Sequence, residues 1–378
     1  MQMRYMEQTS VLVIGASIAG LASAASLQKK GVDYIIIERE GQVGVPWRNH
    51  YDRLHLHTNK GLSNLPYKKF GGMIPRYPSR LQVIGYLDDY QTAFAIRPLF
   101  NTEARSVRKE GDQWITETSN GTFRSKYVVV ATGPFGKPRT IDLAGMETFP
   151  GKILHSYGYK TGRDFKGQKV LVVGFGNSAC EIAMDLYEQG ALPYMAVRSP
   201  VNVIPRDLLG IPILRISLLL SRLPFRLADA IASPLMRLLY GDLARLGLKK
   251  KPYGVFEQIR KEGTTPVLDI GTIRLIREGH IKIYAGIDRI EGRTVIFSDG
   301  KKEDFDVLVA AIGYDRNYAE ILEVGDERYE DLRVSAGRQK YFGREGLYFC
   351  GFWIGPTGQI REIALDAQRI AGDIAKKG

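Results

Sequence analysis

The chain has 378 residues, enough for two or three domains, and its 44% of apolar residues exclude an intrinsically disordered protein. Its two cysteines exclude a disulfide framework and indicate a reducing, cytoplasmic location. The sequence contains no uninterrupted run of about 18 apolar residues, so no transmembrane helix is predicted. The net charge of +12 is spread along the chain without a recognised nucleic-acid motif, so it predicts anionic cofactors and an anionic substrate rather than nucleic acid.

The first predicted elements form a strand–turn–helix–strand unit, and no secretory leader is expected before it because residues 1–8 are few and polar. The segment 10–20 reads SVLVIGASIAG, an apolar strand at 11–14 that breaks into a glycine-rich turn, with a helix at 21–30 and a second strand at 34–37. Glycines let backbone N–H groups approach a pyrophosphate at a helix N-terminus, and an acid after the second strand accepts a hydrogen bond from a ribose hydroxyl. The spacing predicts a dinucleotide site formed by Gly15, Ser17 (in place of the usual middle glycine), Gly20 and Glu38.

A set of short strands is expected next, separated by turn signals, at 107–109, 114–119 and 123–125. The run 127–133 closes this segment as a buried strand that ends in small residues. Small residues at such a strand end let a dinucleotide pass closely, so we assign Thr132 and Gly133 to the first site.

The same layout returns at 169–179, which reads KVLVVGFGNSA, with a strand at 169–173, a glycine turn, a helix at 180–189 and a strand at 195–197. Arg198 follows that last strand, 24 residues after the first glycine of the turn, where the first unit carries an acid. An acid there would repel a 2′-phosphate, whereas arginine pairs with it in a bidentate fork. We therefore predict FAD in the first unit and NADPH in the second. The residues predicted to bind NADPH are Gly174, Gly176, Asn177, Ser178, Arg198 and Ser199.

A second strand with a small-residue end, at 307–314, indicates that the NADPH unit is inserted into the FAD domain. The chain closes with a strand at 347–350, a loop and a helix at 359–375, whose N-terminus is expected to face the flavin. The predicted fold class is α/β, with two Rossmann-like dinucleotide-binding domains. The predicted boundaries are 1–159 and 306–378 for the FAD domain and 160–305 for the NADPH domain.

Residues 211–248 differ from the rest because they are apolar with an arginine every few positions, which excludes a membrane span. We expect helices here, broken at Pro224 and Pro234. Three interpretations stay open for this segment: a helical cover over the active site, a homodimer surface, or a peripheral membrane contact.

Several motifs resemble the flavin-containing monooxygenases. Residues 149–159, FPGKILHSYGY, fit the FxGxxxHxxxY signature of that family and precede the second glycine turn, as they do in the family. The stretches 51–57 (YDRLHLH) and 265–271 (TPVLDIG) resemble the YUCCA branch, the indole-3-pyruvate monooxygenases. Aligned on Lys60, His57 falls where animal-type members carry an active-site asparagine, as in the YUCCA branch.

This resemblance implies an FAD- and NADPH-dependent monooxygenase that uses O2 as co-substrate and acts through a C4a-(hydro)peroxyflavin. It implies that the deprotonated peroxide attacks an aromatic 2-oxo acid such as indole-3-pyruvate, and that loss of CO2 gives indole-3-acetate, a step of auxin biosynthesis. We expect His155 to support the domain junction and expect no metal site. The implied catalytic residues are His57, Asn177 and Arg206, and the cofactor-binding residues added are Arg39, Trp47, Arg53 and Gln359.

Other activities stay open. A protonated peroxide would oxygenate the nitrogen or sulfur of amines and thioethers, and a nearby histidine such as His57 can set that protonation state. A flavin disulfide reductase has the same two-nucleotide architecture but needs a redox-active cysteine pair, whereas Cys180 and Cys350 lie 170 residues apart. A non-catalytic flavin-binding protein also stays open. A Baeyer–Villiger enzyme carries Trp or Pro after the signature histidine, where this chain has Ser156.

Overall fold

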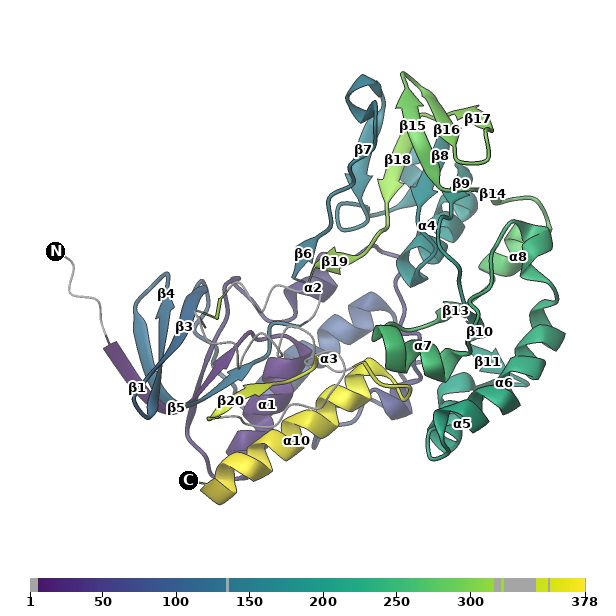
Figure 1. Cartoon of the computed structure of the whole chain (residues 1–378). Coiled ribbons are helices and arrows are strands. Elements are labelled where there is room, and N and C mark those ends of the chain that lie inside the picture. The colour runs from purple at the N-terminus through teal and green to yellow at the C-terminus, as the bar shows by residue number, and fades with distance from the viewer. Residues whose placement is uncertain (1–5, 134–135, 316–320, 323–344, 353, 378) are drawn as a thin grey trace. The chain divides into compact units, whose positions relative to one another are not determined.

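The computed structural model describes residues 6–133, 136–315, 321–322, 345–352 and 354–377 (Figure 1). The chain divides into two compact units: unit 1 comprises residues 1–49, 58–137 and 315–378, and unit 2 comprises residues 50–57 and 138–314. The predicted domain boundaries stay a prediction; unit 2 begins earlier in the chain than residue 160 and includes an N-terminal segment, 50–57.

Unit 1 is built, among its described residues, on a six-stranded sheet. Its strands are β1 (Met6–Ile14), β2 (Tyr34–Ile37), β3 (Ala104–Glu110), β4 (Gln113–Thr118), β5 (Thr122–Val130) and β20 (Leu347–Phe349). The order is β2-β1-β5-β4-β3, with β20 also paired to β5; β1, β2, β5 and β20 run parallel, and β3 and β4 are antiparallel additions. The last four residues of β1 and of β5 are all buried, as apolar runs in parallel strands usually are. The two strands predicted at 123–125 and 127–133 are therefore one strand, β5.

The helices of unit 1 begin with α1 (Ile18–Lys29), which follows the glycine turn directly. The C-terminal helix α10 (Gln359–Lys377) lies alongside α1 (Figure 1). Small side chains occupy much of α1, which is buried from Ile18 to Leu27, so a second helix can approach it closely. The other helices are α2 (Val45–Arg48), a 3-10 turn at Lys60–Leu62, and α3 (Arg80–Ala93), which starts at a capping box between Ser79 and Gln82.

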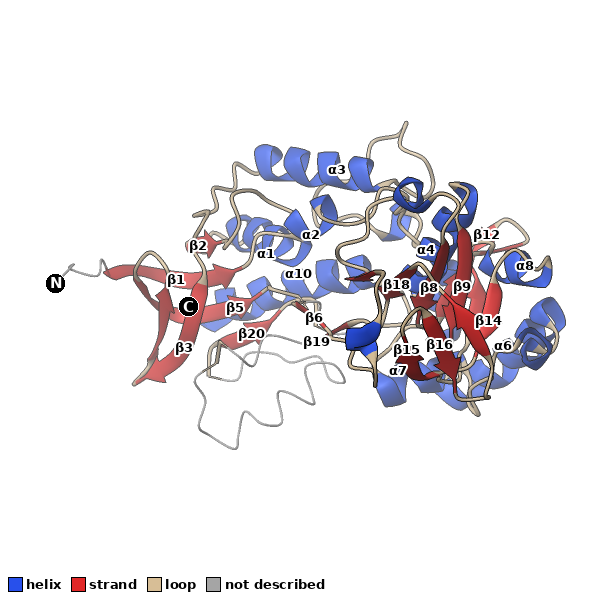
Figure 2. Ribbon diagram, turned by 90° about the horizontal axis from the view of Figure 1, so that it is seen from above, coloured by secondary structure: helices blue, strands red, loops and turns tan. Residues whose placement is uncertain are grey.

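Unit 2 is built on a parallel sheet in the order β14-β9-β8-β18-β7, of which Figure 2 labels β14, β9, β8 and β18. Its strands are β7 (Lys152–His155), β8 (Lys169–Val173), β9 (Leu192–Ala196), β14 (Lys282–Tyr284) and β18 (Val307–Ala310). An antiparallel sheet follows β14 in the chain, formed by β15 (Ile287–Glu291), β16 (Thr294–Phe297) and β17 (Lys302–Asp304). Both sheets contribute to one apolar core that contains Leu171, Tyr194, Phe297 and Phe305.

The rest of unit 2 consists of helices and short strand pairs. The helices are α4 (Asn177–Glu188), α5 (Ile213–Leu220), α6 (Phe225–Tyr240), α7 (Val255–Glu262) and α8 (Thr272–Arg277), with 3-10 turns at Met146–Thr148, Gly162–Phe165 and Leu243–Leu246. The strand pairs of unit 2 are β10 (Val203–Pro205) with β13 (Val267–Asp269) and β11 (Asp207–Leu208) with β12 (Ile211–Pro212). A further pair, β6 (Lys137–Pro138) with β19 (Tyr314–Asp315), stands where the chain passes from one unit to the other, because Lys137 and Asp315 belong to unit 1.

The predicted helices at 211–248 are present, and one predicted break is wrong. α6 begins directly after Pro224, as expected, but Pro234 lies inside α6 and does not interrupt it. Proline removes one backbone N–H, whose acceptor would be the carbonyl of Ala230, and both residues are exposed to water. Among the described residues, no helix combines the length and the apolar character needed to cross a membrane.

Candidate functional site

The turn after β1 accepts only glycine at two positions. Gly15 has a φ of +103°, and a Cβ there would lie 2.9 Å from the carbonyl oxygen of Ala131. A Cβ on Gly20 would lie 1.8 Å from the carbonyl oxygen of Gly15. Ser17 precedes α1 at the N-cap position and its side chain makes no capping hydrogen bond, so the N–H groups of the first turn stay available to an anion. The turn therefore fits the pyrophosphate of a dinucleotide.

Glu38 follows β2 and bends back over this turn. Its Oε2 accepts a hydrogen bond from the backbone N–H of Ala16 at 2.6 Å, and its Oε1 accepts one from Glu40 at 3.1 Å. Two backbone donors thus fix a half-buried carboxylate beside the glycines, while each oxygen keeps a lone pair for a further donor. This position fits the ribose-binding role predicted for Glu38.

The other residues predicted for the FAD site are spread over unit 1, apart from Arg53 in unit 2. Arg39 is exposed and pairs with the carboxylate of the next residue at 3.2 Å. Trp47 is half-buried in α2, and Thr132 is exposed beside Gly133, whose φ is +77°. Gln359, the first residue of α10, donates its side-chain amide to a backbone carbonyl of the preceding loop at 2.6 Å. Their roles stay predictions.

The second glycine turn, after β8, repeats the first. Gly174 has a φ of +118°, and a Cβ there would lie 2.6 Å from the carbonyl oxygen of Ala311. Gly176 is exposed, and a Cβ added there would have no atom within 4 Å. It precedes α4 at the N-cap position, where it offers no side-chain cap. Asn177 Oδ1 accepts a hydrogen bond from the backbone of Leu268 at 2.8 Å, so this side chain ties α4 to β13. The turn leaves an open, uncapped helix N-terminus that suits a phosphate.

Arg198 lies two residues beyond the end of β9, and both Arg198 and Ser199 are exposed. In the described part of the chain, the guanidinium of Arg198 makes no hydrogen bond and no ion pair. Gly286 packs against its stem, because a Cβ on Gly286 would lie 3.1 Å from Cβ and Cγ of Arg198. A guanidinium without an intramolecular partner is ready to pair with a phosphate.

His57 lies against α4, where its Nε2 hydrogen-bonds to Oε1 of Glu181. The imidazole is 16% exposed and the carboxylate only 2%. The second carboxylate oxygen, Oε2, is buried and has no hydrogen-bond partner, and Nδ1 of His57 has none among the described residues. A buried carboxylate needs a hydrogen-bond donor, and in the described part of the chain His57 is the residue that bonds Glu181.

Two further residues of the segment 50–57 contact the same helix. Tyr51 is buried near Ser178 and Glu181 of this helix, and burial, followed by the nearby Glu181, raises the pKa of Tyr51. Arg53 donates from Nε and Nη2 to both oxygens of Glu188, at 2.8 and 2.7 Å. Arg53 is therefore held by α4, and its predicted contact with a cofactor stays a prediction.

Glu181 was not among the predicted site residues, although the sequence holds a signal for it. Ser178, Glu181, Asp185 and Glu188 follow the i, i+3, i+7, i+10 spacing of one helix face, within a helix that is otherwise mostly buried. Asp185 accepts from the hydroxyl of Tyr159 at 2.6 Å, so this face binds the 50–57 segment and the 149–159 motif. Glu181 and Asp185 are buried on this face and Glu188 is exposed, so the pattern indicates partners for the acids but not which ones.

Arg206, the third predicted catalytic residue, follows β10. Its backbone N–H donates to the carbonyl of Asp269 at 3.2 Å, and its Nε lies 3.3 Å from Oδ2 of Asp207. The Arg206 side chain is 33% exposed. Its role towards a carboxylate or a nicotinamide stays a prediction.

Known proteins similar to this chain decide its family. Residues 12–206 match the family model described as pyridine nucleotide-disulphide oxidoreductase. Indole-3-pyruvate monooxygenase YUCCA6 of Arabidopsis thaliana is 37% identical over 380 residues, which cover 97% of this chain and 90% of the relative. The chain belongs to the YUCCA-type flavin monooxygenases. The resemblance inferred from the motifs is confirmed, and the protein is a flavin-dependent monooxygenase.

Solved structures show how widely this α/β fold is used. The flavin-containing monooxygenase from Stenotrophomonas maltophilia is similar, with a TM-score of 0.73 at 19% identity, over 98% of this chain and 99% of that one. The bacillithiol disulfide reductase YpdA from Staphylococcus aureus is also similar, with a TM-score of 0.70 at 17% identity, over 98% and 99% of the two chains. The fold alone therefore does not separate monooxygenases from disulfide reductases, whereas the sequence relatives do.

Neither cysteine of this flavin monooxygenase suits dithiol chemistry. Cys180 and Cys350 are free and buried. Burial raises the pKa of Cys350 to about 12 and raises that of Cys180 as well. Since the thiolate is the reactive form in thiol–disulfide exchange, the environment of both residues disfavours a reductase activity.

Both ring nitrogens of His155, in the family's motif, are occupied. Nε2 donates to the carbonyl of Gly313 at 3.1 Å, and Nδ1 accepts from the backbone N–H of Tyr157 at 3.1 Å. Burial lowers the pKa of His155, which favours the neutral tautomer that these two bonds require. This geometry suits the structural role expected for His155.

Proposed function

We propose that this monooxygenase uses FAD, NADPH and O2 to convert an aromatic 2-oxo acid, such as indole-3-pyruvate, into the acid one carbon shorter. One oxygen atom enters the product acid and the other leaves as water, NADPH becomes NADP+, and the carboxyl group leaves as CO2. The observation that carries this proposal is the 37% identity, over nearly the whole chain, to a protein named indole-3-pyruvate monooxygenase. The predicted cytoplasmic location stays a prediction.

Two Rossmann-like units would hold the nucleotides. Gly15 and Gly20 leave room for the FAD pyrophosphate, and Glu38 offers its carboxylate to the ribose. When bound, FAD supplies the hydride acceptance and oxygen activation that no side chain offers. In unit 2, Gly174 and the α4 N-terminus would receive the NADPH pyrophosphate, and Arg198 would pair with its 2′-phosphate.

His57 is proposed to accept and release a proton at its Nδ1 atom. Glu181 accepts a hydrogen bond from Nε2, so in the neutral ring the proton stays on Nε2 and Nδ1 is left as an acceptor. The buried carboxylate also stabilises the ring if Nδ1 takes up a proton, as an acid does behind a catalytic histidine. Arg206 would bind the carboxylate of the 2-oxo acid, since a guanidinium forms charge-assisted hydrogen bonds with carboxylates.

The test is turnover in air with NADPH and indole-3-pyruvate. The expected result is one labelled oxygen atom from isotopically labelled O2 in indole-3-acetate, and one CO2 for each NADPH consumed. Amines and thioethers serve as competing substrates in the same assay. NADPH consumption that responds to an amine or thioether but is indifferent to the keto acid would overturn the substrate assignment.

A further inference from the structure

α6 presents an apolar stripe to the outside. Eight of the fifteen exposed large apolar side chains among the described residues lie within 209–239. On α6, Leu227 is 49% exposed, Ile231 51% and Leu238 82%, and with Pro234 they follow the i, i+4, i+7, i+11 spacing of one helix face. A surface helix usually buries such a stripe, so the outward face of α6 is organised for contact with a partner.

The orientation of α6 is fixed by its opposite face. Asp229 is buried, and its two carboxylate oxygens accept hydrogen bonds from the backbone N–H groups of Phe256 and Glu257, each at 2.9 Å. These donors belong to the first turn of α7, where a carboxylate also meets the positive end of the helix dipole. Ala228, next to Asp229, is fully buried. Turning α6 to bury its apolar stripe would break both bonds and expose this face.

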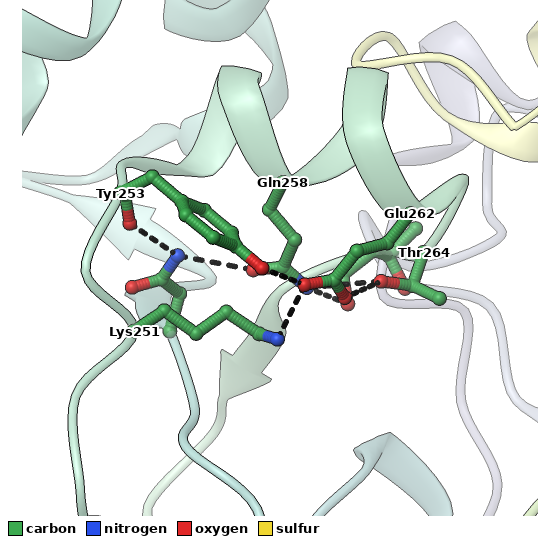
Figure 3. Close-up of polar contacts among 7 residues, drawn as sticks. Lys251, Tyr253, Gln258, Glu262 and Thr264 are labelled. Carbon is green, nitrogen blue, oxygen red and sulfur yellow. Dashed lines mark hydrogen bonds and ion pairs between the residues drawn. The ribbon is translucent and has the colours of Figure 1, made fainter.

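α7 is itself anchored at its other end (Figure 3). Glu262, its last residue, accepts from Nζ of Lys251 at 2.6 Å, from the hydroxyl of Thr264 at 3.0 Å, and from the hydroxyl of Tyr253. The amide of the buried Gln258 donates to Thr264 Oγ1 at 3.2 Å. The pair α6–α7 is therefore held by polar bonds at both ends of α7, and the apolar stripe has no freedom to turn inward.

A second apolar group projects from the hairpin before α5. Leu209 is 96% exposed at the turn between β11 and β12, with a φ of +48°, and Gly210 follows with a φ of +76°. Two consecutive positive φ values define a turn that favours Asn-Gly, so leucine costs conformational energy here. An exposed leucine in an unfavourable backbone conformation gains nothing from the fold, which points to a contact outside it.

The charges around the stripe are almost all positive. Residues 209–251 contain eight lysines and arginines and two acids, a net +6, which is half of the +12 of the whole chain. Of the two acids, Asp229 is buried and accepts a hydrogen bond from the backbone of Phe256. Asp242 accepts one from the backbone N–H of Ala244 at 3.0 Å. Arg226 and Arg237 each precede a leucine of the stripe and are exposed, so cations border the apolar face.

We propose that the outward face of α6, together with the Leu209 turn, binds the surface of an anionic lipid bilayer, with α6 lying in the plane of the interface. Apolar side chains would enter the boundary of the acyl chains while arginines contact lipid phosphates, the arrangement of an interfacial amphipathic helix. In a symmetric homodimer the same face meets itself, which would bring Arg226 and Arg237 of two copies together. The charges therefore favour an anionic surface over a second copy.

The test is co-sedimentation of the full-length flavoprotein with vesicles of phosphatidylcholine, with or without about 30 mol % phosphatidylserine. We expect binding to the anionic vesicles, weakened by added salt, and little binding to the neutral ones. The double variants Ile231→Asn/Leu238→Asn and Arg226→Glu/Arg237→Glu should each lower the partition coefficient roughly tenfold or more.

Matched controls are an exposed leucine and an exposed lysine elsewhere in unit 2. Leu192→Asn and Lys301→Glu change residues that are 49% and 65% exposed and should bind vesicles as the parent chain does. The proposal is overturned if the parent chain stays in the supernatant with anionic vesicles at low salt, or if controls and stripe variants lose binding equally. It is also overturned if the stripe variants bind vesicles as the parent does and their only effect is to convert a dimer into a monomer, measured by light scattering, or to raise the KM for the keto acid.

Discussion

Replacing His57 by leucine should destabilise unit 2 because it leaves a carboxylate buried without a partner. Leucine fills much of the space of the imidazole, so packing is largely kept while the hydrogen bond is lost. The Glu181 side chain is only 2% exposed, and its Oε2 already has no hydrogen-bond partner. In the variant, neither of its oxygens would have one. Replacing Glu181 by glutamine in addition removes the charge and should restore part of the lost stability.

Leaving a buried carboxylate without its hydrogen-bond donor costs about 3–5 kcal/mol when the donor is charged, and the lower end of that range or less when it is a neutral imidazole. His57 is 16% exposed, so water can reach the vacated position, and the lower end, about 3 kcal/mol, applies. The second change, Glu181→Gln, leaves a neutral amide whose lost hydrogen bond costs about 1 kcal/mol, so roughly 2 kcal/mol should return. At about 2–4 °C per kcal/mol for a unit of this size, the single variant loses about 6–12 °C in Tm and the double variant regains about 4–8 °C.

The assay is thermal unfolding of the purified flavoprotein at neutral pH, for the parent, both single variants and the double variant. Glu181→Gln alone should lose only about 1 kcal/mol, because its side-chain oxygen still accepts from His57. The four melting temperatures form a double-mutant cycle. If the double variant melts no higher than His57→Leu, the carboxylate does not depend on the imidazole, and the pairing argument fails.

Three other substitutions test the two nucleotide turns and the family's histidine. Arg198→Ala should weaken NADPH about 10- to 100-fold and leave NADH nearly unchanged, measured as KM in NADPH- and NADH-driven flavin reduction. Gly20→Ala should abolish flavin retention, because its Cβ would lie 1.8 Å from a backbone oxygen; absorbance after gel filtration reports the flavin content. Burial lowers the pKa of His155 in the folded chain below its value in the unfolded chain. The unfolded chain therefore binds more protons, and the folded state loses stability as the pH is lowered through the range between these two pKa values. In His155→Gln this loss should be smaller, which a measurement of Tm against pH checks.

Each of these predictions has an internal comparison. Equal losses for NADPH and NADH would show that Arg198 does not contact the 2′-phosphate. Gly85→Ala, in α3, adds a Cβ with nothing within 4 Å and should keep both flavin and stability. A Gly20→Ala protein as yellow as Gly85→Ala would contradict the steric argument. An unchanged pH dependence in His155→Gln would mean that other groups titrate in this range.

The glycine turns were predictable because their requirements are local. Gly15 and Gly174 end buried strands, and a short apolar run followed by glycines and a helix has few alternatives. The family resemblance was also present in the sequence, since the 149–159 and 265–271 motifs are contiguous. The helix break expected at Pro234 was wrong, because a proline on an exposed helix face costs one hydrogen bond that water replaces.

The pairing of His57 with Glu181 was not predictable, since the two residues are 124 positions apart and join only when the 50–57 segment packs on α4. The outward face of α6 was not predictable either. Its sequence pattern fixes an apolar stripe, but whether that stripe faces the core or the solvent depends on Asp229 and its bonds to α7.

By itself, the sequence determined the local elements of this protein: two helices that follow glycine turns, an acid after one unit, an arginine after the other, and a cationic apolar segment. The tertiary structure alone decided which distant groups share a buried charge and which side of α6 meets the solvent. The physical reason is that backbone geometry and periodicity act over a few residues, whereas a buried charge or an exposed stripe depends on what packs against it from elsewhere in the chain.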